Sequence, residues 1–215
     1  MRRIAVKPDM LKSLFPRKQP EVAKSKDVVI VSGLPRSGTS MMMKMLEEGG
    51  LEIVTDAIRS ADDDNPNGYY EFEPVKQLSA GQADWLKGSQ GKVVKVISAL
   101  LEYLPSNYHY KVIFMERAIQ EVLASQKKML VNRNEDSKTS DAEMQAQFQK
   151  HVAAAKYWLA RQPNIEVLYV DYNKMLASPD QFCETVADFL GMDINVEKMR
   201  AVPNERLYRN RAAHP

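Results

Sequence analysis

One segment of eight residues constrains the fold of this chain more than any other. It reads GLPRSGTS, and it lies between a β-branched run at 27–32 and an amphipathic helical pattern. A glycine-rich turn between a buried strand and a helix directs backbone N–H groups and the positive end of the helix toward one point. Gly33 and Gly38 have the spacing of the two glycines in a phosphate-binding loop. The chain should therefore contain a strand–loop–helix unit that binds an anion.

The rest of the chain alternates between strand patterns and helix patterns. Short apolar runs rich in strand-forming residues recur, and amphipathic helical stretches separate them. This alternation predicts an α/β fold with three αβα layers and a mostly parallel central sheet, like the P-loop nucleotide-binding proteins. The predicted strands are 27–32, 51–54, 93–97, 112–115 and 167–170, and the predicted helices are 40–48, 119–130, 142–160 and 179–190.

Charge is distributed unevenly along the 215 residues. The net charge of only +2 excludes a basic coat for binding nucleic acid. Residues 1–26, however, carry eight basic and two acidic side chains, which leaves the remainder slightly acidic. A length of this order fits one ordinary domain. We therefore predict a basic N-terminal arm at 1–26 and a single domain at 27–215.

The sequence shows no feature of a membrane or secreted protein. No apolar run approaches the roughly 18 residues of a membrane helix, and Lys7, Asp9 and Lys12 interrupt any secretory signal. The single Cys183 has no partner for an internal disulfide. We expect a cytoplasmic protein without a membrane span, in which Cys183 is a small buried hydrophobic residue.

The loop departs from that of the nucleotide triphosphatases at one decisive point. Those enzymes have Lys and then Ser or Thr after the second glycine, whereas here Thr39 and Ser40 follow and the cation is Arg36. The strand that would supply a metal-holding Asp ends instead at Glu116 and Arg117, which disfavours Mg-dependent phosphoryl transfer. A sulfuryl group on a phosphate carries less negative charge than a terminal phosphoryl group. Arg and Lys side chains can neutralise that charge without a metal ion.

With these residues in place, the loop resembles the 5′-phosphosulfate loop of the sulfotransferases that use 3′-phosphoadenosine 5′-phosphosulfate (PAPS). Arg117 precedes Ser125 by eight residues, the spacing at which that family places an Arg and a Ser on the 3′-phosphate. The geometry is sensible because a strand-end Arg and a hydroxyl two turns into the next helix can converge on one anion.

Further stretches are similar to the same family, so that the resemblance spans roughly residues 27–191. VVKVISALLEYLP resembles the strand that carries a catalytic Lys, here Lys95. VLYVDYNKMLASP resembles a late strand that is followed by Tyr and a helix. The turn PNGYYE at 66–71 is similar to one in the compact bacterial type.

The resemblance implies a metal-independent, in-line transfer of a sulfuryl group from PAPS to an acceptor hydroxyl or amine. Release of 3′,5′-bisphosphoadenosine (PAP) completes the reaction. Lys95 and Arg36 would stabilise charge on the oxygen between sulfur and phosphorus. The residues implied to bind the donor are Pro35, Arg36, Ser37, Gly38, Thr39, Ser40, Arg117 and Ser125.

The general base must differ from that of the cytosolic branch of the family. That branch has a catalytic His two residues after the Lys, where this chain has Ile97. Other branches resemble this chain in using a Glu from the loop after the first βαβ portion, and a positioned carboxylate can accept the proton of the acceptor. Glu71 is therefore the first candidate and Glu73 the second. His151 is expected on the polar face of its helix.

Two other functions stay open at this point. The loop could cradle ATP in a nucleotide-kinase type of phosphotransferase, with Arg36 replacing the Lys, or it could belong to a non-catalytic nucleotide-binding module that has lost the catalytic His. The acceptor could be a small molecule or a glycan, and the oligomeric state is not predicted. Arg206 and Arg209 are weak candidates for a late contact to the donor.

Overall fold

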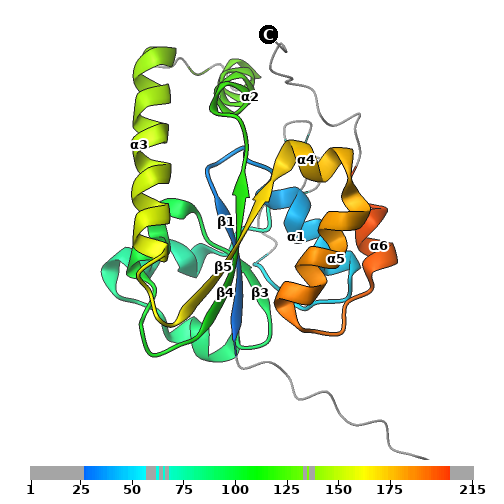
Figure 1. The fold of residues 1–215 in the computed structure, drawn as a ribbon. Coiled ribbons are helices and arrows are strands. Elements are labelled where there is room, and N and C mark those ends of the chain that lie inside the picture. The colour runs from blue at the N-terminus through cyan, green and yellow to red at the C-terminus, as the bar shows by residue number, and fades with distance from the viewer. Residues whose placement is uncertain are drawn as a thin grey trace, which may run out of the picture.

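The computed structural model describes residues 27–56, 62, 65, 68–132, 135 and 139–203. At its centre lies a five-stranded sheet in the order β2-β3-β1-β4-β5, in which every neighbouring pair is parallel. Helices cover both faces, so the predicted three-layer fold is confirmed (Figure 1). The strands are β1 (Val28–Gly33), β2 (Ile53–Val54), β3 (Val93–Lys95), β4 (Tyr110–Glu116) and β5 (Ile165–Asp171).

The helices divide between the two faces of the sheet. In Figure 1, α1, α4, α5 and α6 lie on one side of the strands, and α3 lies on the other. The α-helices are α1 (Thr39–Glu48), α2 (Ile119–Asn132), α3 (Asp141–Leu159), α4 (Tyr172–Ala177), α5 (Pro179–Leu190) and α6 (Val196–Arg200). Three 3-10 helices, η2 (Glu73–Ala80), η3 (Asp84–Gly88) and η4 (Ser98–Tyr103), flank β3.

Strand β1 is buried on both faces because successive side chains of a strand point to opposite sides. Val29 and Val31 join one hydrophobic cluster with residues of α1, α4, α5 and α6. Val28 and Ile30 join a second cluster with residues of α3 and the three 3-10 helices. The chain turns from one half of the sheet to the other around β1. Ligands of open α/β sheets bind beyond the carboxyl ends of strands at such a position, which is where the loop 33–40 lies.

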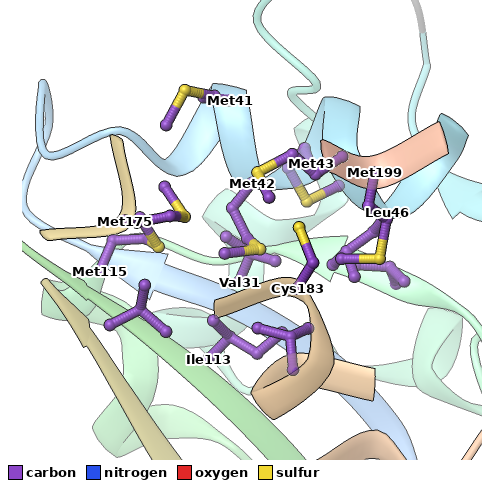
Figure 2. Packing of buried hydrophobic residues seen from close by; sticks show 14 of the residues in the cluster. Val31, Met41, Met42, Met43, Leu46, Ile113, Met115, Met175, Cys183 and Met199 are labelled. Atoms are coloured by element: carbon purple, nitrogen blue, oxygen red, sulfur yellow. The ribbon is translucent and has the colours of Figure 1, made fainter. Parts of the chain in front are cut away.

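Methionine fills the core directly under this loop, as Figure 2 shows. Met41, Met42, Met43 and Met45 of α1 are all buried, and their unbranched thioethers suit irregular gaps. Cys183 packs in the same cluster, and burial raises the pKa of its thiol to about 11. The thiol is therefore protonated at neutral pH, which confirms the interpretation of Cys183 as a small hydrophobic residue.

The boundaries of the predicted elements shift by a few residues, for local reasons. The predicted strand at 93–97 ends at Lys95, and the region around it contains three short 3-10 helices that the sequence patterns did not indicate. Helix α3 begins at Asp141 because Ser140 and Glu143 form a capping box, in which each side chain accepts a hydrogen bond from the backbone N–H of the other.

Some predictions fall outside the described residues. They concern the basic arm at 1–26, Arg206 and Arg209. Among the helices that the structure describes, none combines the length and apolarity needed to cross a bilayer.

Candidate active site

The loop between β1 and α1 is built around its two glycines. Gly33 and Gly38 have φ angles of +145° and +99°, which favour glycine. A Cβ on Gly33 would lie 2.6 Å from the carbonyl oxygen of Met115, and one on Gly38 would overlap the ring of Tyr172. The loop therefore packs against β4 on one side and against the start of α4 on the other, so its path is fixed before any ligand binds.

The inside of the loop offers hydrogen-bond donors to an anion. Ser37 is 1% exposed, and its hydroxyl has no hydrogen-bond partner among the described residues. Thr39 and Ser40 begin α1, where backbone N–H groups lack intrahelical acceptors. No acidic residue lies in that first turn. A buried hydroxyl without a partner is unusual, and an anionic ligand in the loop would satisfy it, so these residues fit the phosphosulfate end of a PAPS molecule.

Arg36 connects the loop to α2. Its φ of +71° is rare for a residue other than glycine, and its Nε donates to the Ser125 hydroxyl at 3.0 Å. Arg117, at the end of β4, donates from Nη1 to the backbone carbonyl of Arg36 at 3.2 Å. The structure thus brings Arg36, Arg117 and Ser125 together, as expected for the last two residues. The sequence did not indicate that Arg36 would contact Ser125.

Arg117 is held on several sides. Its Nε donates to the carboxylate of Glu121 at 2.9 Å, and the side chains of this pair are 7% and 1% exposed. The guanidinium lies over the ring of Tyr172, 4.5 Å from the ring centroid. Tyr172 therefore contacts both the loop, at Gly38, and the basic side chain beside it.

Lys95 extends from the end of β3 to the start of α1. Its Nζ donates to the Ser40 hydroxyl at 3.1 Å and to the backbone carbonyl of Tyr69 at 2.8 Å. β3 lies between β2 and β1, so Lys95 is not a side chain that extends into solvent from a sheet edge. The lysine instead joins the loop at 33–40 to the segment that precedes Glu71.

The two candidate bases lie in the segment that leads from Tyr69 to η2. The backbone carbonyl of Glu71 accepts from the Thr55 hydroxyl at 2.9 Å, and its side chain is half-buried. Glu73 is exposed, begins η2 and forms an ion pair with Lys76 at 2.6 Å. The carboxylate of Glu73 thus has a local partner in its own helix, whereas Glu71 lies two residues from the Tyr69 carbonyl that Lys95 contacts.

Asp62 and Asn65 make polar contacts next to the loop. The Asp62 carboxylate accepts hydrogen bonds from the Tyr69 hydroxyl at 2.8 and 2.7 Å. Asn65 donates from Nδ2 to the Ser40 hydroxyl at 2.8 Å. Within the described ranges, no three His, Cys, Asp or Glu residues are grouped as metal ligands.

Sequence reasoning missed several residues near this site. Glu121 follows Arg117 by four residues, and the rule that opposite charges at this spacing interact could have identified it. No pattern indicated that Tyr172 would pack on Gly38. His151 was expected on a polar face, but it is half-buried and its Nε2 lies 2.8 Å from the Ser98 hydroxyl at the start of η4.

Comparison with known proteins identifies the fold and the family of the chain. No curated protein matches the chain. Among solved structures, a mouse sulfotransferase, SULT7A1, complexed with PAP superposes with a TM-score of 0.55 and 18% identity, covering 88% of this chain and 67% of the mouse chain. The sulfotransferase domain of the Synechococcus PCC 7002 olefin synthase gives a TM-score of 0.49 and 13% identity, over 84% and 78% of the two chains.

The likeness to SULT7A1 concerns the fold alone, since the identity is low. The family model of the sulfotransferase domain matches residues 26–211, which include every described residue of the site. The chain belongs to the sulfotransferase family.

Proposed function

We propose that this protein transfers a sulfuryl group from PAPS to a hydroxyl or amine of a small-molecule or glycan acceptor. In this proposal, residues Pro35 to Ser40 hold the 5′-phosphosulfate, and Arg117 with Ser125 holds the 3′-phosphate. Arg36 and Lys95 act at the oxygen that leaves, and Glu71 accepts the proton of the acceptor.

The convergence of basic groups on one loop carries the proposal. Arg36 lies within the loop, Arg117 donates to its backbone, and Lys95 donates to the hydroxyl of Ser40 where the loop enters α1. These three basic residues come from β1–α1, β4–α2 and β3, segments that are far apart in the sequence. A donor with a phosphosulfate at one end and a 3′-phosphate at the other needs cations at two neighbouring points, and this arrangement provides them.

The proposed chemistry requires charge stabilisation at one oxygen. The acceptor oxygen or nitrogen forms a bond to sulfur while the bond from sulfur to the bridging oxygen breaks. The electron pair of that bond stays on the bridging oxygen, which leaves as part of PAP. Lys95 and Arg36 would stabilise the charge that builds there, so that arginine and lysine, without a metal ion, supply the electrostatic effect. The proton of the acceptor passes to Glu71.

Ligand-dependent melting tests the proposal against the two other functions. Micromolar PAP without Mg²⁺ should raise the melting temperature of the full chain, because a ligand that binds only the folded state stabilises it. Stabilisation by ATP with Mg²⁺ alone would contradict the proposal and favour a phosphotransferase. Binding of PAP without transfer from PAPS to any acceptor of a broad panel would favour a non-catalytic module.

A matched pair of arginine variants tests the assignment of the 3′-phosphate site. Arg117→Ala should weaken PAP binding by about 2–3 kcal/mol, the range for a charged hydrogen-bond partner. Arg161→Ala is the control because Arg161 also lies over a tyrosine ring, that of Tyr157, but on the surface. Isothermal titration should show wild-type affinity for the control. Equal affinities of both variants would refute the role of Arg117.

A further inference from the structure

Glu121 is a buried carboxylate that the proposed chemistry does not use. It lies in the first turn of α2, and its side chain is 1% exposed. One oxygen accepts from Nε of Arg117 at 2.9 Å, and the other accepts from Nδ2 of Asn173 at 3.1 Å. Glu121 therefore joins the end of β4 to the start of α4 directly behind the proposed 3′-phosphate site.

The contacts of Arg117 fix the orientation of its guanidinium. Glu121 engages the Nε edge, the Arg36 carbonyl engages Nη1, and the ring of Tyr172 covers one face. A guanidinium has five N–H donors in a rigid fork, so it can keep these contacts and still bind a phosphate. Holding a flexible side chain in the bound orientation beforehand lowers the ordering cost of binding.

We propose that Glu121 is a positioning residue that holds Arg117 ready for the 3′-phosphate before the donor binds. The inference rests on the proposed function, since it takes the 3′-phosphate as the ligand of Arg117. A purely electrostatic role would act in the opposite direction, because a negative charge beside the site weakens the binding of an anion. The two effects can therefore be separated by experiment.

Two substitutions separate hydrogen-bond geometry from charge. Glu121→Ala removes the acceptor of the Arg117 Nε–H. Glu121→Gln removes the charge but keeps an oxygen for that donor. The amide nitrogen introduced by Glu121→Gln then faces Asn173. The side-chain oxygen of Asn173 is buried and lacks a partner among the described residues. The Asn173 amide can therefore turn so that this oxygen accepts a hydrogen bond from the introduced amide.

The readout is the affinity of each full-length variant for PAP and for AMP, which lacks the 3′-phosphate. We expect Glu121→Ala to bind PAP about tenfold more weakly than the wild type, the order seen when a group that orients a ligating side chain is lost. Its affinity for AMP should stay within about twofold, whereas a general structural defect would weaken both ligands alike. Glu121→Gln should bind PAP within about threefold of the wild type.

Several results would overturn the inference. They are unchanged or tighter PAP binding by Glu121→Ala, equal losses for PAP and AMP, and a loss in Glu121→Gln as large as that in Glu121→Ala. Failure of the wild type to bind PAP would instead refute the proposed function. The two failures are therefore distinguishable.

A measurement on the wild-type protein covers the case in which Glu121→Ala does not fold. The Nε–H resonance of Arg117, assigned by its loss in Arg117→Lys, should be shifted and slow to exchange in the protein without nucleotide. It should persist when PAP is added. A resonance that becomes protected only after PAP binds would show that Arg117 is not held beforehand, and the inference would be wrong.

Discussion

The loop at 33–40 and the segment at 68–73 face the same site, but they are held in place in different ways. The loop lies on a wholly buried strand and a methionine-filled core, and its glycines pack against Met115 and Tyr172. The segment is packed as well, with Tyr69 buried and the Phe72 ring edge-on to Trp85, but it adds hydrogen bonds from Lys95 to the Tyr69 carbonyl and from Tyr69 to the exposed Asp62. Close packing tolerates little change, whereas a hydrogen bond to an exposed side chain such as Asp62 can be exchanged without repacking the core. Under the proposed function, this difference suits a loop that binds the same donor in every turnover and a segment that contacts the acceptor.

The largest expected effect is on catalysis and comes from the 68–73 segment. Glu71→Gln should lower kcat by about 10²–10⁴-fold, the usual contribution of a general base. The affinity for PAP should not change, because the loop and Arg117 are intact. Transfer kinetics with radiolabelled PAPS would measure the first quantity, and titration calorimetry the second.

Glu73→Gln is the comparison for this prediction, because Glu73 is the second candidate base. Its expected loss is much smaller, since its carboxylate already pairs with Lys76. A large loss in Glu73→Gln with normal turnover of Glu71→Gln would transfer the role to Glu73.

The second effect tests the packing of the loop. Gly38→Ala places a Cβ against the ring of Tyr172 at a φ of +99°. Strain at positive φ costs about 1–2 kcal/mol, and overpacking adds about 1–3 kcal/mol. The free energy of unfolding, measured in urea, should fall by the sum of these two costs. The affinity for PAP should also fall, because the loop is displaced.

Gly50→Ala is a closely matched control for this prediction. Gly50 has a φ of +97°, but no atom lies within 4 Å of its added Cβ. In Gly50→Ala the free energy of unfolding should fall only by the cost of the positive φ angle, and the affinity for PAP should equal that of the wild type. Equal destabilisation of the two variants would mean that the contact with Tyr172 does not constrain the loop.

The smallest effect concerns the polar contacts of the 68–73 segment. Tyr69→Phe removes the hydroxyl that donates to Asp62, and the loss of such a hydrogen bond at a partly exposed site should cost about 1 kcal/mol. We expect kcat/KM for the acceptor to fall about fivefold, the size of that cost, while the affinity for PAP stays constant.

Tyr70→Phe provides the comparison. It removes the hydroxyl of the neighbouring, more exposed ring, which donates to Glu47 on the surface of α1 at 2.7 Å. This variant should leave both parameters near the wild-type values. A weaker affinity for PAP in Tyr69→Phe would show that the segment and the loop are coupled more tightly than the contrast between them suggests.

The position of the loop at 33–40 and of the residues beside it was largely predictable from the sequence because its signals are local. Gly33 and Gly38 follow one strand at a fixed spacing, and the chain placed them between β1 and α1 as expected. Arg117 and Ser125 were expected to converge, because a short connection fixes the position of the second turn of α2 relative to the end of β4. Both are now found beside Arg36.

The remaining contacts were not predictable because they join segments distant in the sequence. The hydrogen bond of Arg36 to Ser125 spans 89 positions, and that of Lys95 to Ser40 spans 55. Each depends on the order of strands in the sheet, and short runs of residues do not specify that order. The 3-10 helices around β3 were not predicted for another reason. Segments of five to eight residues are too short to show helical periodicity.

The sequence by itself determined that a loop with a glycine near each end would lie between a buried strand and a helix, because the spacing of glycines and the pattern of apolar residues are properties of adjacent positions. It also predicted that Arg36 and Lys95 would supply the charge, in place of the lysine that follows the second glycine in nucleotide triphosphatases. Only the tertiary structure decided which of these side chains meet. A parallel sheet brings the carboxyl ends of β1, β3 and β4 to one edge, and burial of Glu121 and Tyr172 beside Arg117 fixes how the charge is presented.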